Sequence, residues 1–219
     1  MEGLTGVVLA GGKSSRFGSD KAWVVVADKP MLQWVADALA GVCDGLVVVR
    51  APGQALPALN WPGEVVVAED RYEDMGPLAG FVSGFPAVAT PLCFAVACDT
   101  PLLNPRLVTH LAGLAEGWDV VCPLVEERLQ PLVAVYRPES CLPVFREFVE
   151  RGNLKITAAF GRLRLRTISE AEVAMVDPGL ESFRNANRPE EAAELGEILL
   201  LRERNAGRAA GGKGAEGAG

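Results

Sequence analysis

Short, continuous apolar runs alternate with segments of helical length along most of this sequence, and this alternation constrains the fold more than any other feature. Strands that are buried on both faces of a parallel sheet are apolar along their whole length. Runs of this kind lie at residues 6–10, 46–49, 65–67 and 92–97, and shorter ones follow at 120–121, 132–135 and 163–168. We therefore predict a three-layer, Rossmann-like α/β fold with a mostly parallel, buried central sheet and a small mixed-sheet extension after about residue 120.

The helices are predicted from the segments between these strands and from their proline and asparagine boundaries. The predicted ranges are 30–42, 77–88, 105–116 with Asn104 as its N-cap, a helix from Pro138 onward, and 189–202. Residues 126–131 are expected to form a loop. The chain has 219 residues, 49% of them apolar, which is enough for one sizeable core, so we predict a single domain over residues 1–203. Residues 204–219 are rich in glycine and alanine and are predicted to be disordered.

Charge and composition exclude several classes of function. The net charge of −7 argues against a nucleic-acid-binding face, which would need clustered lysine and arginine. No apolar segment is long enough to span a bilayer, so no membrane association is expected. The first apolar stretch has no basic region ahead of it and continues into a predicted core strand, so we predict a cytoplasmic protein.

The cysteines and the single histidine limit the available chemistry. The five cysteines are odd in number and form no Cys-x-x-Cys motif, so we interpret them as buried, reduced thiols. The only histidine, His110, lies in a predicted helix and is interpreted as an ordinary helix residue. Catalysis is therefore expected to depend on carboxylates, lysine, arginine and backbone amides.

The loop after the first strand carries the strongest functional signal. It reads Leu-Ala-Gly-Gly-Lys-Ser-Ser-Arg-Phe-Gly-Ser-Asp-Lys over residues 9–21 and leaves the carboxyl end of a predicted parallel strand, where such folds bind ligands. Adjacent glycines let backbone N–H groups approach phosphate oxygens, and Lys13, Arg16 and Lys21 add positive charge. A Walker A loop would need glycine at Val7, so that motif is excluded. The alternative is a surface loop with solvated charges.

This loop matches the pattern L-A-G-G-x-S-x-R-x-G-x-D-K at every specified position. The pattern resembles that of the molybdenum cofactor guanylyltransferase (MobA) family of nucleotidyltransferases. Three further landmarks follow in the family's order, at residues 69–80, 97–101 and 183–191, so the resemblance covers residues 4 to about 200. It implies a nucleotidyltransferase fold in which the N-terminal part binds nucleotide and the part after about residue 120 binds the acceptor.

Asp99 is the main candidate for a Mg²⁺ ligand and for contact with the nucleotide. It follows an apolar strand, where a carboxylate is costly to bury without a cation or donors, and the resemblance also implies a magnesium ligand there. The alternative is an N-cap or turn residue before Pro101. Lys21 is predicted to contact the NTP phosphates and Arg16 to support the leaving pyrophosphate, the alternative being that both charges are solvated.

The resemblance implies further contacts. It assigns nucleotide binding to Leu9, Ala10, Gly11, Gly12, Lys21, Asp70 and Asp99, and acceptor binding to Asn185 and Asn187. From the residues alone, Asp70 equally suits a cap for its own loop, and the two asparagines a turn before the last helix. Guanylyl members often have asparagine after the second strand, whereas this chain has Arg50, which either replaces that contact or faces solvent.

The implied reaction is Mg²⁺-dependent transfer of GMP from GTP to the phosphate of molybdopterin or molybdenum cofactor, with release of pyrophosphate. GTP and the cofactor would be the substrates, and molybdoenzymes or cofactor-insertion proteins the transient partners. Alternatives are a cytidylyltransferase using CTP on the same acceptor, a sugar-phosphate nucleotidyltransferase, and a non-catalytic cofactor carrier or adaptor. Gly11-Gly12 and Asp20-Lys21 favour GTP, because the cytidylyl relatives tend to begin this loop with Ala-Ala-Gly.

Overall fold

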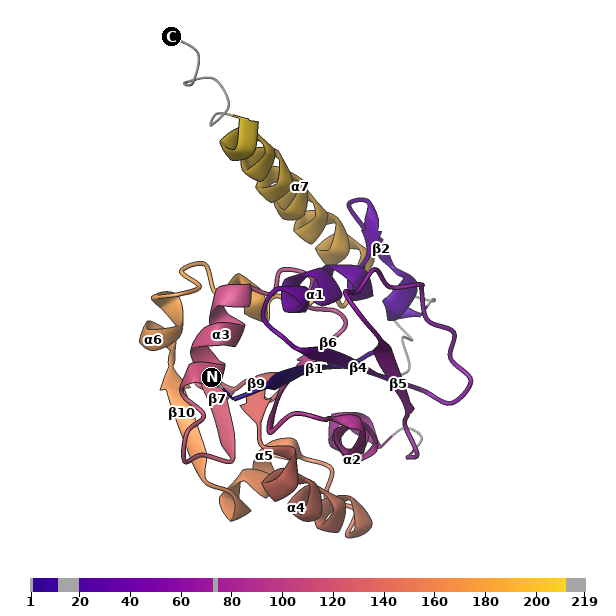
Figure 1. Ribbon diagram of the computed structural model, residues 1–219, viewed down its shortest axis with the longest axis vertical. Helices are drawn as coiled ribbons and strands as arrows, with labels where there is room; N and C mark the ends of the chain where they lie inside the picture. The colour runs from indigo at the N-terminus through magenta and orange to yellow at the C-terminus, as the bar shows by residue number, and fades with distance from the viewer. Residues whose placement is uncertain (1, 12–19, 73–74, 212–219) are drawn as a thin grey trace.

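The computed structural model describes residues 2–11, 20–72 and 75–211, with side chains up to residue 205. Its main feature is one sheet with the strand order β10-β7-β9-β6-β1-β4-β5, and a short strand β8 pairs with β7 (Figure 1). The strands of this sheet are β1 (Leu4–Leu9), β4 (Gly45–Arg50), β5 (Val65–Glu69), β6 (Leu92–Ala97), β7 (Val120–Val125), β8 (Arg128–Leu129), β9 (Val133–Tyr136) and β10 (Leu165–Ser169).

The centre of the sheet is parallel, as predicted. β1 lies between β4 and β6 and is parallel to both, so Leu9 is level with Val49 on one side and with Ala97 on the other. β9 runs antiparallel to β6 and to β7, which gives the mixed extension expected after about residue 120. The carboxyl ends of β1, β4 and β6 therefore meet at one edge of the sheet.

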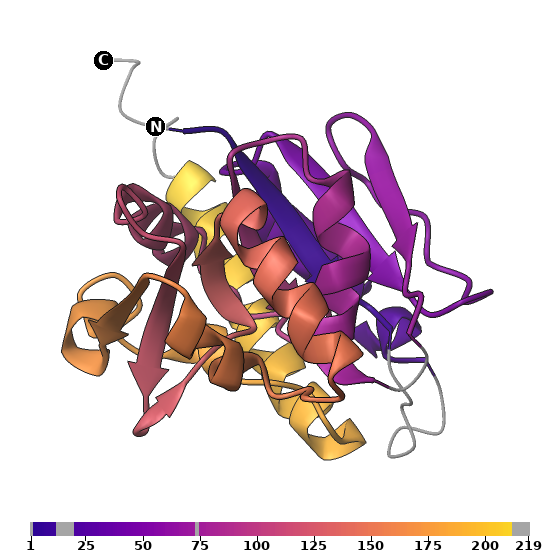
Figure 2. The same ribbon diagram turned by 90° about the horizontal axis from the view of Figure 1, so that it is seen from below.

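Helices cover both faces of the sheet and make three layers (Figures 1 and 2). One core cluster against the sheet contains Val8 of β1 and a second, on the opposite face, contains Val7, because successive side chains of a strand point to opposite faces. The helices on the Val8 side are α1 (Met31–Ala40), α3 (Pro105–Gly113) and α6 (Glu170–Ala174), and those on the Val7 side are α2 (Gly76–Gly84), α4 (Pro138–Glu150) and α5 (Ile156–Ala159). The predicted three-layer α/β fold is confirmed.

The last helix, α7 (Pro189–Gly211), packs through its first half on a small hairpin of β2 (Val25–Val26) and β3 (Lys29–Pro30). Leu195 and Leu199 are buried there with Trp34. The second half of α7 extends away from the body (Figure 1). The helix continues to Gly211, past the predicted end near residue 202. Arginine, glutamate and alanine in this stretch have high helix propensity, which outweighs its glycine content. Residues 212–219 lie outside the described part.

Two other local predictions also need correction. The apolar run at residues 65–67 predicts a buried strand, but β5 is the last strand of the sheet, and Val66 and Val67 are 39% and 46% exposed. An apolar run does not reveal whether a strand has neighbours on both sides. Residues 126–131 contain β8 rather than only a loop, because Glu126 and Glu127 adopt positive φ angles and form a two-residue turn between β7 and β8.

The cysteines are all free, and all but Cys43 are buried. Burial raises the pKa of Cys122 and of Cys141 to about 12, so these thiols stay protonated at neutral pH. This agrees with the interpretation of the cysteines as reduced thiols. Within the described residues, no helix is both long and apolar enough to cross a membrane.

An ion pair at the start of β7 joins that strand to β10. The Asp119 carboxylate accepts hydrogen bonds from the backbone N–H of Arg164 at 2.9 Å and from its Nε and Nη2 at 3.0 and 2.7 Å. The hydrogen bonds from Arg164 lower the pKa of Asp119 to about 2. The carboxylate is buried, whereas the Arg164 side chain is 61% exposed, so water screens part of this interaction.

We expect Asp119→Asn to lower the free energy of unfolding at pH 7 by about 1–2 kcal/mol, because the hydrogen bonds lose a charged acceptor. The pKa of Asp119 is lowered by folding, so the carboxylate contributes its full stability above the unfolded value of about 3.9. That contribution is lost as the pH falls through about 2. Urea unfolding of the wild type and of Asp119→Asn can be compared at roughly pH 7, 4 and 2.5, which span this window. The difference between their free energies of unfolding should shrink as the pH falls. A constant difference would contradict the assignment.

Candidate active site

Asp99 and Lys21 meet at the carboxyl edge of the sheet. Cys98 continues from β6 and donates its backbone N–H to the Leu9 carbonyl at 3.0 Å, which places Asp99 beside the end of β1. Asp99 is only 8% exposed, and its Oδ2 lies 2.7 Å from Lys21 Nζ. The end of the first loop and the acid that follows the central strand, predicted to converge, are therefore in contact.

The second carboxylate oxygen of Asp99 is chemically unusual. Oδ1 is buried and has no hydrogen-bond partner among the described residues, which is costly for a charged oxygen. The described residues contain no cluster of three or more His, Cys, Asp or Glu side chains that would hold a metal by themselves. A single carboxylate fits Mg²⁺, which takes most of its other ligands from phosphates and water. Of the two alternative roles considered, Asp99 does lie in a turn after β6, whereas the N-cap of the next helix, α3, is Asn104.

Lys21 is held at both its backbone and its side chain. It begins the short 3-10 helix η1 (Lys21–Trp23), whose N-cap Asp20 accepts a hydrogen bond from the Ala22 N–H at 3.0 Å. Besides its contact with Asp99, Lys21 Nζ donates to Asn187 Oδ1 at 2.9 Å. The ammonium group is therefore fixed between two oxygens, which differs from the solvated charge considered as the alternative.

The two asparagines before α7 reach the same place from the far end of the chain. Asn185 Oδ1 accepts from Thr100 Oγ1 at 3.3 Å, and Asn187 contacts Lys21. Between them, the Ala186 N–H donates to the Asp99 carbonyl at 2.9 Å. The segment therefore packs directly on the Asp99 turn, and the side chain of Asn187 contacts the residue predicted to bind the nucleotide.

The start of the first loop is held by β4. The Ala10 and Gly11 N–H groups both donate to the Val49 carbonyl, at 2.8 and 3.2 Å. A Cβ on Gly11 would lie 3.0 Å from the backbone nitrogen of Ala51, so glycine permits this close approach. Leu9 belongs to β1, and its side chain is buried in the core. Gly12 and Arg16, also predicted to be in the site, lie outside the described residues.

Asp70 follows β5 and lies near the end of β4. Its backbone N–H donates to the Arg50 carbonyl at 2.7 Å, and its Oδ1 accepts from the Tyr72 N–H and from Ser83 Oγ. The local capping role considered from the sequence is therefore present. Arg50 does not simply face solvent, because its Nη2 lies 2.7 Å from Glu69 Oε1 and its Nη1 donates to the Gln54 carbonyl.

Gln54 is a residue of this region that sequence reasoning missed. Its Nε2 donates to the Ala10 carbonyl at 3.1 Å and to Asp20 Oδ2 at 2.6 Å, and its Oε1 accepts from the Ala51 N–H at 2.8 Å. One amide therefore contacts both sides of the first loop. A single glutamine in a Pro-Gly-Gln-Ala stretch matches no motif, so only the structure reveals its contacts.

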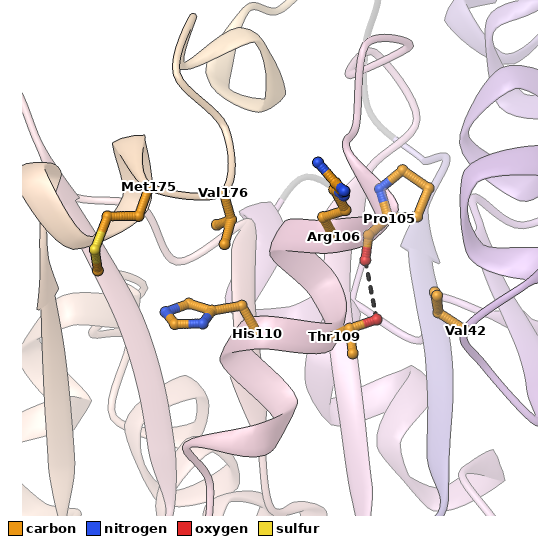
Figure 3. A pocket seen from close by; sticks show the side chains of 7 residues that line it. All are labelled: Val42, Pro105, Arg106, Thr109, His110, Met175 and Val176. Atoms are coloured by element: carbon orange, nitrogen blue, oxygen red, sulfur yellow. Dashed lines mark hydrogen bonds between the residues drawn. The ribbon is translucent and has the colours of Figure 1, made fainter.

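A separate pocket of about 560 Å³ lies along α3 and contains none of these residues (Figure 3). Its lining residues are Val42, Pro105, Arg106, Thr109, His110, Met175 and Val176. His110 faces this pocket from the last turn of α3, and its Nε2 has no hydrogen-bond partner among the described residues. The histidine therefore lies in a helix, as predicted, and outside the candidate active site.

A known protein family matches most of this chain. The model of the family described as "MobA-like NTP transferase domain" matches residues 6–166. The chain is 38% identical to the molybdenum cofactor guanylyltransferase of Desulfosudis oleivorans over 193 residues, which cover 87% of this chain and 93% of that protein. It is 36% identical to the probable molybdenum cofactor guanylyltransferase of Natronomonas pharaonis over 198 residues, which cover 89% and 98% of the two chains.

A solved structure supports the fold. The crystal structure of molybdopterin-guanine dinucleotide biosynthesis protein A from Archaeoglobus fulgidus has a TM-score of 0.72 to this chain. The match covers 90% of this chain and 99% of that one, at 22% sequence identity. At this identity the likeness concerns the arrangement of strands and helices.

Proposed function

This chain belongs to the MobA-like NTP transferase family, and from that premise we propose that it is a molybdenum cofactor guanylyltransferase. In the proposed reaction, a phosphate oxygen of molybdopterin attacks the α-phosphorus of GTP. The bond between the α-phosphorus and the bridging oxygen to the β-phosphate breaks, and pyrophosphate leaves. The observation that carries this proposal is the contact of Lys21 with a buried Asp99 that keeps one carboxylate oxygen without a hydrogen-bond partner among the described residues.

The protein's part in such a transfer is to hold attacker and leaving group in line and to offset charge on the phosphates. Lys21 supplies a fixed positive charge at the sheet edge, and glycine at position 11 lets the start of the first loop pack closely against the Ala51 backbone. Asp99 is the proposed ligand of Mg²⁺, which when bound would neutralise phosphate charge. Arg16 and Gly12 are proposed to bind phosphate oxygens from the same loop.

The remaining contacts divide between the two substrates. Asp70 and the neighbouring Arg50 lie at the ends of β5 and β4, and we assign Asp70 to the base or ribose of the nucleotide. Asn185 and Asn187 are assigned to the acceptor side, as the resemblance to the family implies, and Ala186 between them contacts Asp99. The proposed organisation is one domain, with the nucleotide bound by the N-terminal part and the acceptor by the part after about residue 120.

The setting of the reaction follows from the same proposal. Five free cysteines fit a reducing compartment, so we place the protein in the cytoplasm. Its product would be a guanine dinucleotide form of the cofactor, which must pass to an enzyme that uses it. Molybdoenzymes or cofactor-insertion proteins are therefore the proposed transient partners.

A nucleotide panel tests the base specificity. GTP with Mg²⁺ should raise the melting temperature more than CTP, UTP or ATP at the same concentration, because binding to the folded state alone stabilises it. The difference in melting temperature should be about 3–11 °C for a tenfold to hundredfold preference, which corresponds to roughly 1.4–2.7 kcal/mol. A larger shift with CTP would instead support a cytidylyltransferase.

Turnover separates the enzyme from a carrier. Incubation with GTP, Mg²⁺ and molybdopterin should release pyrophosphate in proportion to the dinucleotide formed. Omitting molybdopterin should stop pyrophosphate release, which controls for hydrolysis of GTP. Tight GTP binding without transfer to a competent acceptor would contradict the proposed enzyme and favour a carrier.

A further inference from the structure

Gln54 connects the two sides of the glycine-rich first loop. Its Nε2 donates to the Ala10 carbonyl at the start of the loop and to the Asp20 carboxylate at its end. The loop between these residues carries the glycines and cations that match the family pattern. Gln54 itself lies shortly after β4. Its Oε1 accepts a hydrogen bond at 2.8 Å from the N–H of Ala51, the first residue after that strand.

Both partners of Gln54 lead directly to groups proposed to act on the nucleotide. The Ala10 N–H donates to the Val49 carbonyl of β4, and Gly11 packs against the Ala51 backbone. Asp20 uses its other oxygen, Oδ1, to cap the short helix that begins with Lys21. A shift of Asp20 would therefore move the backbone of Lys21, whose ammonium group contacts Asp99.

The amide group is chemically required for these contacts. They need two N–H donors, one for a carbonyl and one for a carboxylate, together with an oxygen that accepts from a backbone N–H. Among side chains, only asparagine and glutamine combine these groups. Glutamate has almost the same shape and keeps the acceptor oxygen. It would, however, place a second carboxylate against Asp20, so the attractive hydrogen bond would become a repulsion between two negative charges.

We propose that Gln54 is a positioning residue for the nucleotide: it fixes the separation of the two ends of the first loop and so places Lys21 and the Ala10–Gly11 backbone for binding the NTP phosphates. This inference rests on the proposed function for the choice of nucleotide and acceptor and for the phosphate-binding role of Lys21 and the Ala10–Gly11 backbone. It predicts that loss of the amide weakens GTP binding specifically and leaves the acceptor's KM near its normal value.

Gln54→Glu is the primary test, and Gln33→Glu is its matched control. Gln33 on α1 has the same three kinds of contact elsewhere: its Nε2 donates to Asp37 Oδ1 and to the Asn60 carbonyl, and its Oε1 accepts from the Asn60 N–H. Both variants lose similar hydrogen bonds and should have similarly lowered melting temperatures. Only Gln54→Glu should raise the KM and Kd for GTP, by roughly tenfold to a hundredfold, as expected for displaced binding groups.

Exchange of donor and acceptor provides a rescue. In the double variant Asp20→Asn with Gln54→Glu, the new amide at position 20 can donate to the new carboxylate at position 54. GTP affinity should therefore be better than in Gln54→Glu, and the recovery should be partial because a carboxylate at position 54 cannot donate to the Ala10 carbonyl. If Gln54 only stabilised the fold, GTP affinity would not recover in the double variant without a matching rise in its melting temperature.

The inference is overturned if folded Gln54→Glu binds GTP like the wild type, if Gln33→Glu weakens binding equally, or if the double variant shows no recovery. If Gln54→Glu does not fold, Gln54→Met removes the same polar groups without added charge. The KM and Kd for GTP of that variant then test the inference. Calorimetric GTP binding with Mg²⁺ is measured in parallel with turnover. Nucleotide binding by the wild type without transfer to molybdopterin would contradict the proposed function but would still test Gln54.

Discussion

Replacing Asp99 by asparagine should lower GMP transfer by about a hundredfold to a thousandfold or more. Asparagine has nearly the same shape but no negative charge, so the ion pair with Lys21 and the proposed Mg²⁺ ligand are both lost. A binding measurement checks this independently of turnover. Mg²⁺ should increase the affinity of the wild type for GTP, as measured by calorimetry, and should have little effect on the affinity of Asp99→Asn.

Asp177→Asn is the matched control for this prediction. Asp177 is also a buried aspartate, but its carboxylate accepts from the Ser182 N–H at 3.0 Å and supports the segment after α6. Its loss should reduce stability and leave the Mg²⁺ dependence of GTP binding intact. If Asp99→Asn retains both turnover and the effect of Mg²⁺ on GTP affinity, Asp99 is not the metal ligand.

The parts of the fold that were predictable are those fixed by local pattern. Continuous apolar runs such as residues 46–49 and 92–97 are typical of strands buried between two helical layers, and both are central strands. The position of a strand within the sheet depends on pairing between distant segments. Residues 65–67 have the same apolar character, yet they form the edge strand β5, because the sheet has no further strand beyond it among the described residues.

The candidate site was predictable where its residues follow strand ends. Lys21 and Asp99 are 78 residues apart in sequence, but they follow β1 and β6, and neighbouring parallel strands bring their carboxyl ends to one edge. The contact of Asn187 with Lys21 spans 166 residues and depends on how α7 packs. The contacts of Gln54 span 44 and 34 residues and arise from an irregular loop. No periodicity in the sequence records such contacts.

Replacing Lys21 by alanine should lower the turnover of GTP by about a hundredfold to a thousandfold, equivalent to roughly 3–4 kcal/mol of transition-state stabilisation. The ammonium group is already held by Asp99 and Asn187, so little reorganisation is needed when phosphates bind. Its removal also leaves the Asp99 carboxylate without its only described ion-pair partner, and the melting temperature without Mg²⁺ should fall by a few degrees. The fold itself should remain intact by circular dichroism.

Lys29→Ala separates this effect from a general loss of positive charge. Lys29 also forms ion pairs, with Asp37 and Glu203, but these are half-exposed contacts between β3, α1 and α7. Because exposed pairs contribute about 0–1 kcal/mol, this variant should keep near-normal stability and turnover. Steady-state pyrophosphate release should therefore distinguish the two lysines by about two orders of magnitude. Equal turnover of the two variants would remove Lys21 from the phosphate site.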